Sequence, residues 1–284
     1  MIEQKPQNLV LVALFVIVTL FTAYMEGYLR AGQEGFLGRG ISELFWLVLI
    51  FGFAIAFWMA CRITTARLLS LMLGIFIIEY IKEGIGIKSG MWAYTNPNSY
   101  NIGVWAWVMG GMTVFWVAVR LVIRGMRKLT AGLSRRWDLL NPVMVIMVFA
   151  IIPLTLGEYA SGEKWQQGQW WFWGLYALLF LLTLVTAIRM EFPVFLGLLL
   201  TTWILAFPSE YAGSVPHLTI WEFTFNKTYP PPFLIFGCWP LEIFTQYALS
   251  ALLADELLNK YTFSEEKVIS HASHARTEQR RTAV

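Results

Sequence analysis

The chain has 284 residues, of which 57% are hydrophobic and only 14% charged, and its formal net charge is +3. This composition excludes an ordinary soluble domain and favours an integral membrane protein. The Lys and Arg residues gather in a few loops, so we ascribe them to membrane topology and expect no nucleic-acid partner.

Eight apolar runs approach the roughly 20 residues that a membrane-crossing helix needs. They cover about 8–28, 42–61, 68–83, 103–123, 141–158, 170–188, 193–209 and 232–254. The sequence therefore predicts an all-α polytopic membrane protein with about eight transmembrane helices. Eight spans place both termini on one side, and most Lys and Arg residues fall on that side. Because cytoplasmic loops retain positive charge, we expect a multi-pass protein of the cytoplasmic (inner) membrane with both termini in the cytoplasm.

Two short motifs occur twice, in the same order. Glu83-x-x-Gly86 returns as Glu210-x-x-Gly213, and Trp92-x-Tyr94 returns as Trp221-x-Phe223. This pattern predicts two parallel four-helix repeats, 1–132 and 133–256, related by a pseudo-twofold axis along the membrane normal. The remaining residues, 257–284, are polar and are expected to form a disordered cytoplasmic tail.

Acidic residues within or beside the apolar runs are the candidate functional groups, because a charge at membrane depth must be paired, hydrated or protonated. Glu79 and Glu83 are four positions apart and so lie on one helix face. Glu242 is expected near the middle of the last span, directly after Pro240, which is expected to kink that helix. A protonated Glu242 that satisfies carbonyl groups freed by the kink is a purely structural alternative.

Carboxyl groups in different surroundings can form an acid–base pair. One carboxyl in an apolar pocket stays protonated and serves as the acid, while another stays ionised and serves as the base. Aromatic faces stabilise a carbocation, so such a pair suits protonation of a carbon–carbon double bond. The candidate catalytic residues are Glu79, Glu83, Glu210 and Glu242, and the candidate substrate-binding residues are Trp92, Tyr94, Trp221, Phe223 and Trp239.

No cofactor and no metal ion are expected, and no disulfide either. The chain has no dinucleotide-binding glycine fingerprint, Walker loop, iron-binding histidine cluster or zinc-ligand spacing. Its two cysteines, Cys61 and Cys238, are predicted at different depths in the membrane.

The segment Glu83-x-x-Gly86-x-x-x-Gly90-x-Trp92-x-Tyr94 resembles the signature of membrane carotenoid hydratases of the bisanhydrobacterioruberin type. Glycine and proline in this region are expected to form a tightly folded loop that begins after Glu83.

A later series, Trp221-x-Phe223, Pro231-Pro232 and Trp239-Pro240-Leu241-Glu242, resembles the heterodimer-type lycopene cyclases. Both families are helical membrane proteins that act on isoprenoid double bonds by acid chemistry without net redox change. The resemblance therefore implies that Glu83, Glu210 and Glu242 are acids. The chain departs from the cyclase pattern at Ile243, where a second Glu is expected.

Three functions are compatible with these observations. The first is an enzyme for acid-catalysed cyclisation or hydration of an apolar polyene. The second is a non-catalytic pigment- or lipid-binding subunit of a larger membrane complex, and the third is a transporter. The expected partners are the lipid bilayer, an apolar small-molecule substrate or pigment, and other membrane proteins.

Overall fold

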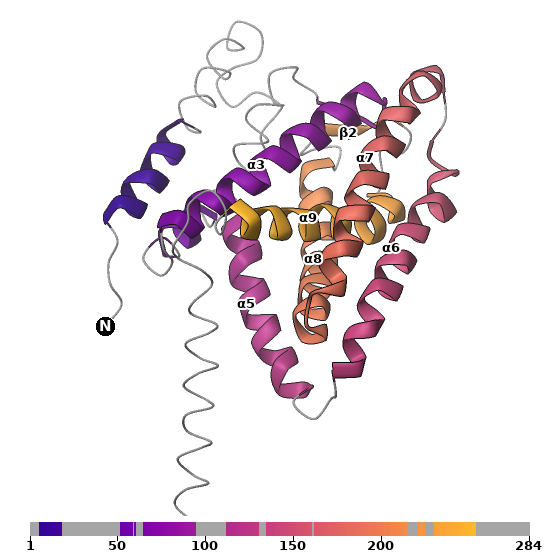
Figure 1. The fold of residues 1–284 in the computed structure, drawn as a ribbon. Helices are drawn as coiled ribbons and strands as arrows, with labels where there is room; N and C mark the ends of the chain where they lie inside the picture. The colour runs from indigo at the N-terminus through magenta and orange to yellow at the C-terminus, as the bar shows by residue number, and fades with distance from the viewer. Residues whose placement is uncertain are drawn as a thin grey trace, which may run out of the picture.

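The computed structural model describes residues 6–18, 52–58, 60, 65–94, 112–130, 135–160, 162–214, 221–224 and 230–253. Most of this part of the chain is helical (Figure 1). The long helices are α3 (Thr65–Lys88), α5 (Met112–Leu129), α6 (Leu140–Leu156), α7 (Glu163–Ile188), α8 (Phe192–Ser214) and α9 (Trp239–Leu252). The short elements are the strands β1 (Trp92–Tyr94) and β2 (Trp221–Phe223), the 3-10 helix η2 (Arg135–Leu139) and the π-helix η3 (Phe233–Cys238). Two further helical segments, 6–18 and 52–58, belong to the N-terminal part.

The helices coincide with the predicted apolar runs, which confirms the mainly helical fold. Three of them are long and apolar enough to cross a membrane: Arg136–Leu156, Glu163–Ile188 and Phe192–Tyr211. Large apolar side chains are exposed on these helices, including Met147 at 64% and Leu154 at 79%. Exposed apolar surface on long apolar helices is typical of a protein whose solvent is lipid, and it supports a membrane protein.

Helix α3 is longer than the predicted span, and this corrects the expected loop. The helix continues past Glu83 to Lys88, so Gly84 and Gly86 are helical rather than part of a turn. The turn itself is made at Gly90, which has a φ of 71° and so adopts the left-handed conformation that glycine tolerates.

The helix that carries Glu242 is irregular, but the irregularity precedes Pro240. The π-helix Phe233–Cys238 runs directly into α9, and the backbone N–H of Trp239 donates to the carbonyl of Leu234, a five-residue step. Pro240 is in the first turn of α9, and because η3 runs directly into this helix, its ring and its missing N–H act on the preceding turn, where the π-helix lies. Glu242 therefore lies in the first turn of a regular helix that follows a π-helical segment.

Helix α9 connects α3 to α7 and α8. It packs against α3, α7 and α8, while α5 packs against α8 (Figure 1). In the core, Phe195 of α8 stacks on Phe244 of α9 with ring centroids 4.7 Å apart. A second apolar cluster joins the N-terminal helical segments to α3 through Val12, Phe53 and Leu68.

The strands form a short antiparallel pair beside the C-terminal end of α3. Trp92 is opposite Phe223, Ala93 is opposite Glu222, and Tyr94 is opposite Trp221. Met91 and Thr224 extend the contact through a backbone hydrogen bond of 3.2 Å. This pairing ties two segments together that are distant in the sequence.

Polar side chains of η2 and α6 fix the connection between α7 and α8. The Nδ2 of Asn141 donates to the carbonyls of Ala187, at 3.3 Å, and Met190, at 2.7 Å. The Asp138 carboxylate accepts from the backbone N–H of Phe192 at 2.8 Å, at the start of α8.

Candidate functional site

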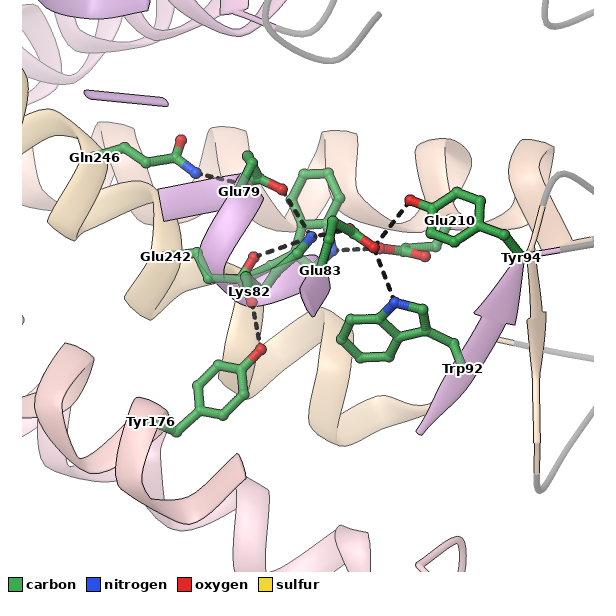
Figure 2. A network of polar contacts seen from close by, with 10 residues as sticks. Glu79, Lys82, Glu83, Trp92, Tyr94, Tyr176, Glu210, Glu242 and Gln246 are labelled. Atoms are coloured by element: carbon green, nitrogen blue, oxygen red, sulfur yellow. Dashed lines mark hydrogen bonds and ion pairs between the residues drawn. The ribbon is translucent and has the colours of Figure 1, made fainter. Parts of the chain in front are cut away.

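Lys82 is at the centre of a buried polar cluster. Its side chain projects from α3 and is only 5% exposed. The Nζ lies 2.8 Å from Glu79 Oε2, 2.9 Å from Glu83 Oε1 and 3.7 Å from Glu242 Oε2 (Figure 2). One ammonium group is therefore within ion-pair distance of three carboxyl groups.

The spacing of residues on α3 brings the first two carboxyl groups to Lys82. Glu79 precedes Lys82 by three residues, a spacing at which helix side chains meet. Glu83 is the next residue in the chain and reaches the ammonium through its flexible side chain. Glu79 is buried, and its Oε1 accepts a hydrogen bond of 2.5 Å from Gln246 Nε2 on α9. Helix α9 thus supplies a polar partner to α3 at their contact.

Strand β1 supplies the partners of Glu83. Its Oε2 accepts hydrogen bonds from Trp92 Nε1 and from the Tyr94 hydroxyl, both 2.9 Å long (Figure 2). Trp92 and Tyr94 are two positions apart, so they lie on the same face of the strand. Gly86 leaves room for the indole, because a Cβ at that position would lie 1.9 Å from Trp92 Cζ2. The motif from Glu83 to Tyr94 is therefore one structural unit in which helix, turn and strand converge on a single carboxylate.

The other two carboxyl groups come from α8 and α9. Glu242 is 1% exposed, and its Oε1 accepts a hydrogen bond of 2.5 Å from the Tyr176 hydroxyl of α7. Glu210 is also buried, and its Oε1 accepts a hydrogen bond of 2.7 Å from Trp239 Nε1. The Trp239-Pro240-Leu241-Glu242 segment therefore carries one of these carboxyl groups and holds the other.

The charges of the cluster do not balance if every carboxyl is ionised. A single ammonium can neutralise one carboxylate, whereas the described residues bring four carboxyl groups together. Uncompensated buried charges are strongly unfavourable, and neighbouring carboxylates repel one another. The cluster must therefore retain protons that the same residues would lose in water.

The Tyr94 hydroxyl stays protonated, and so remains a hydrogen-bond donor, at physiological pH. Burial, and then the neighbouring Glu83 carboxylate, raise the pKa of its hydroxyl well above the ordinary value. The phenol therefore remains protonated at physiological pH and continues to donate to Glu83.

The structure brings all four predicted carboxyl residues, Glu79, Glu83, Glu210 and Glu242, into one cluster. Their catalytic roles stay predictions.

Among the five predicted aromatic residues, three reach the cluster as hydrogen-bond donors: Trp92, Tyr94 and Trp239. Phe223 is buried opposite Trp92 in the strand pair. Trp221 is placed by its backbone alone, and its side chain lies outside the described part.

Sequence reasoning missed three members of the cluster: Lys82, Tyr176 and Gln246. In the sequence Lys82 counts only as one of the few positive charges expected on the outer side of the membrane. Its position three residues after Glu79 was the signal that could have paired it with that carboxyl group. Tyr176 and Gln246 lie in apolar runs, where a single hydroxyl or amide carries no pattern.

Within the described ranges, no group of three or more His, Cys, Asp and Glu residues is placed to hold a metal ion. The space between the carboxyl groups is taken by the Lys82 ammonium (Figure 2).

Fold and site together define a mainly helical protein with membrane-length apolar helices and a buried cluster of acids around one lysine. The chain shows no significant match to a protein-family model, to a curated protein or to a solved structure. Its function must therefore be argued from the site.

Proposed function

We propose that this chain is an integral membrane enzyme that adds water to, or cyclises, an apolar polyene of the isoprenoid class by acid–base catalysis without redox change. The observation that carries the proposal is the buried cluster of four carboxyl groups around Lys82, with Trp and Tyr side chains against three of the carboxyls. Such a cluster holds protonated and ionised carboxyl groups side by side, which acid–base catalysis at a double bond requires.

Glu242 is the proposed acid. Among the three carboxyl groups in contact with Lys82 it is the most distant, at 3.7 Å, and it is nearly inaccessible. Its proton forms a new C–H bond with one carbon of the double bond, and the other carbon becomes a carbocation. The faces of Trp92 and Trp239 are the proposed cation-stabilising surfaces, and Tyr94, Trp221 and Phe223 are the proposed contacts of the apolar chain.

Glu83, whose carboxylate lies 2.9 Å from the Lys82 ammonium, is the proposed base. Glu79 and Glu210 are proposed to pass protons between Glu83 and Glu242 after each turnover. In hydration, a water oxygen bonds to the carbocation and one of its protons passes to the carboxylate. In cyclisation, a second double bond attacks the carbocation, and loss of a neighbouring proton forms the final double bond. The first reaction adds one water and the second is an isomerisation, so neither needs an oxidant.

The experiment is expression in a host whose membranes accumulate a linear polyene, followed by chromatography and mass spectrometry of the pigments. A hydratase adds the mass of one water, whereas a cyclase gives a product of unchanged mass with a shorter chromophore. In D2O either product should carry deuterium on carbon.

Glu242→Gln should lower turnover by about 10²–10⁴-fold, the usual contribution of a general acid. The matched control is Glu163→Gln, which makes the same change at an exposed position on α7. Wild-type turnover in the Glu242→Gln variant would remove Glu242 as the acid, and the absence of any product from linear polyenes would overturn the proposal.

The proposal includes two parallel four-helix repeats with both termini in the cytoplasm. The strand register supports the repeats. If Trp92-x-Tyr94 and Trp221-x-Phe223 are equivalent, a twofold rotation exchanges the two strands and reproduces the observed antiparallel pairing. In the proposed repeat, α3 corresponds to α8 and α5 corresponds to α9. The same rotation therefore exchanges the contact of α3 with α9 and the contact of α8 with α5, and both contacts are present.

A buried asparagine gives a further matching pair in the two halves. Asn8 Nδ2 donates to the carbonyl of Ala60 at 2.9 Å, as Asn141 Nδ2 does to that of Ala187. In this arrangement the cluster lies between the repeats, because α3 belongs to one and α7, α8 and α9 to the other.

One observation favours a second candidate, a proton-coupled transporter. Substrate sites of transporters lie at repeat interfaces and use irregular helices, and here η3 runs into α9 beside the cluster. Proton uptake into vesicles that depends on an added apolar substrate, with that substrate recovered unchanged, would favour the transporter. A chemically altered product would favour the enzyme.

A further inference from the structure

The position of Lys82 bears on how protons are distributed within the cluster. Its ammonium lies 2.8 Å from Glu79 and 2.9 Å from Glu83, but 3.7 Å from Glu242. Glu79 and Glu83 each accept at least one further hydrogen bond, from Gln246 and from Trp92 and Tyr94 respectively. Both features favour the ionised form of these two carboxyl groups.

The second pair of carboxyl groups is in a different setting. Glu242 and Glu210 are buried, and each accepts a hydrogen bond from a neutral donor: Glu242 from the Tyr176 hydroxyl and Glu210 from the Trp239 indole. A single ammonium cannot offset four negative charges in this volume, so these two carboxyl groups are the ones that keep protons.

We infer that Lys82 is the positioning residue that sets the proton distribution of the cluster: it holds Glu79 and Glu83 ionised and leaves Glu210 and Glu242 protonated. This inference deepens the proposed function, because it states which carboxyls are available as acids and which as bases. It does not depend on the reaction, since the proton distribution exists in the resting protein.

Among the described residues, the titratable groups that face Lys82 all enter this account. Helix α3 contributes Glu79 and Glu83, and strand β1 contributes Tyr94. The others are Tyr176 on α7, Glu210 on α8, Cys238 at the end of η3, and Glu242 on α9. The phenols and the thiol are uncharged donors or acceptors, so Lys82 is the one cation among the described groups of the cluster.

Infrared difference spectroscopy of the purified protein tests the inference directly. Protonated carboxyl groups absorb apart from carboxylates, and their band shifts in D2O. At neutral pH the wild-type protein should show this band, and Glu242→Gln and Glu210→Gln should each weaken it by about one carboxyl group. Glu83→Gln should leave it unchanged, because the residue it replaces is ionised.

Lys82→Met removes the charge but keeps the length of the side chain. It should strengthen the protonated-carboxyl band by about one group or more, and Lys82→Arg should return it towards the wild-type intensity. A purely structural role for Lys82 would not produce this charge-dependent change in the spectrum.

Two results would overturn the inference: a wild-type protein without a protonated-carboxyl band at neutral pH, or a band of equal intensity in the wild type and in Lys82→Met. If Lys82→Met does not fold, the double variant Lys82→Met/Glu83→Gln keeps the net charge of the cluster. It leaves Glu79 as a buried charge without its cation, so Glu79 should take up a proton and the band should again exceed that of the wild type. These spectra need no substrate, so a failure of the proposed reaction and a failure of the proton assignment are seen separately.

Discussion

Gly86 offers a sharp test of how the cluster is built. Replacing it with Ala adds one methyl group on the face of α3 that contacts Trp92. That carbon would lie 1.9 Å from Cζ2, 2.2 Å from Cε2 and 2.3 Å from Cη2 of the indole. Because ordinary carbon–carbon contacts are about 3.5–4.0 Å, the ring must move by well over 1 Å.

Such a movement has two costs. Trp92 is 5% exposed, so displacing it strains the packing around it, typically by about 1–3 kcal/mol. It also breaks the 2.9 Å bond from Trp92 Nε1 to Glu83, which leaves a buried polar group without its partner and costs about 1–3 kcal/mol. The better helix propensity of Ala returns about 1 kcal/mol. We therefore expect a net destabilisation of about 1–5 kcal/mol.

Gly174→Ala is the matched control, because it makes the same change within helix α7 and its added methyl would meet nothing within 4 Å. This variant should be unchanged or stabilised by up to about 1 kcal/mol. The free energy of unfolding, or the midpoint of thermal unfolding in detergent, distinguishes the two variants.

A double-mutant cycle isolates the cause. Trp92→Ala removes the ring that the new methyl group would strike, so Gly86→Ala should cost little in that background. Equal effects of Gly86→Ala in the presence and absence of Trp92, or equal stability of Gly86→Ala and Gly174→Ala, would refute the reasoning.

Two further predictions concern single hydrogen-bonding groups. Tyr94→Phe should lower the free energy of unfolding by about 1.5–3 kcal/mol, the range for a hydrogen bond to a charged group. The loss should be the same at pH 6 and at pH 9, because the raised pKa of Tyr94 keeps its hydroxyl protonated at both. Since the unfolded phenol ionises near pH 10 while the native one does not, the contribution of Tyr94 to stability should decline only above about pH 10; a decline between pH 6 and 9 that Tyr94→Phe abolishes would contradict this. Asn141→Leu removes the donor to the carbonyls of Ala187 and Met190 and should destabilise the protein by about 2–3 kcal/mol, measured by denaturant unfolding. An unchanged midpoint of unfolding would show that these hydrogen bonds are dispensable.

The parts of this fold that could be predicted are those with local signals. Long apolar runs predicted the helices, and the four-residue spacing of Glu79 and Glu83 predicted that these two side chains share one helix face. The motif from Glu83 to Tyr94 was visible because its glycines and aromatics lie within a dozen residues of each other. In each case the relevant physics acts between residues close in sequence, or on the whole segment through its hydropathy.

The end of α3 shows where such signals mislead. Lys82, Glu83 and two glycines lower the hydropathy and resemble the end of a membrane helix, so the span was ended too early. The helix continues because these charges are satisfied within the protein: Lys82 pairs with Glu79 and Glu83, and Glu79 also accepts from Gln246 on α9. A hydropathy window cannot see a partner that is 167 residues away.

Other features depended on contacts between distant segments. The strands are only three residues long, and neither is stable without the other, so a strand prediction from local propensity had no basis. The hydroxyl of Tyr176 reaches Glu242 across 66 positions in the sequence. The irregularity of this helix was expected as a kink caused by Pro240, because a proline perturbs a helix in any context, whereas no residue pattern in 233–238 identifies a π-helix.

The proposed repeat also explains why the cluster has one lysine rather than two. If Glu83 is equivalent to Glu210, the positions of Glu79 and Lys82 correspond to Ala206 and Ser209 in the second half. Only α3 therefore brings an ammonium group, and α8 brings a carboxyl without one.

The second half contributes Glu242, Gln246 and Tyr176 through α9 and α7 instead. Neither half alone holds the cluster: the first would lack Gln246, one of the two partners of Glu79, and the second would bury Glu210 and Glu242 without the nearby ammonium of Lys82. Because Glu79 accepts a hydrogen bond from Gln246 and Lys82 lies 3.7 Å from Glu242, the cluster is complete only when the two halves of the chain pack together. A variant that separates α3 from α9 should therefore lose the polar cluster before it loses the individual helices.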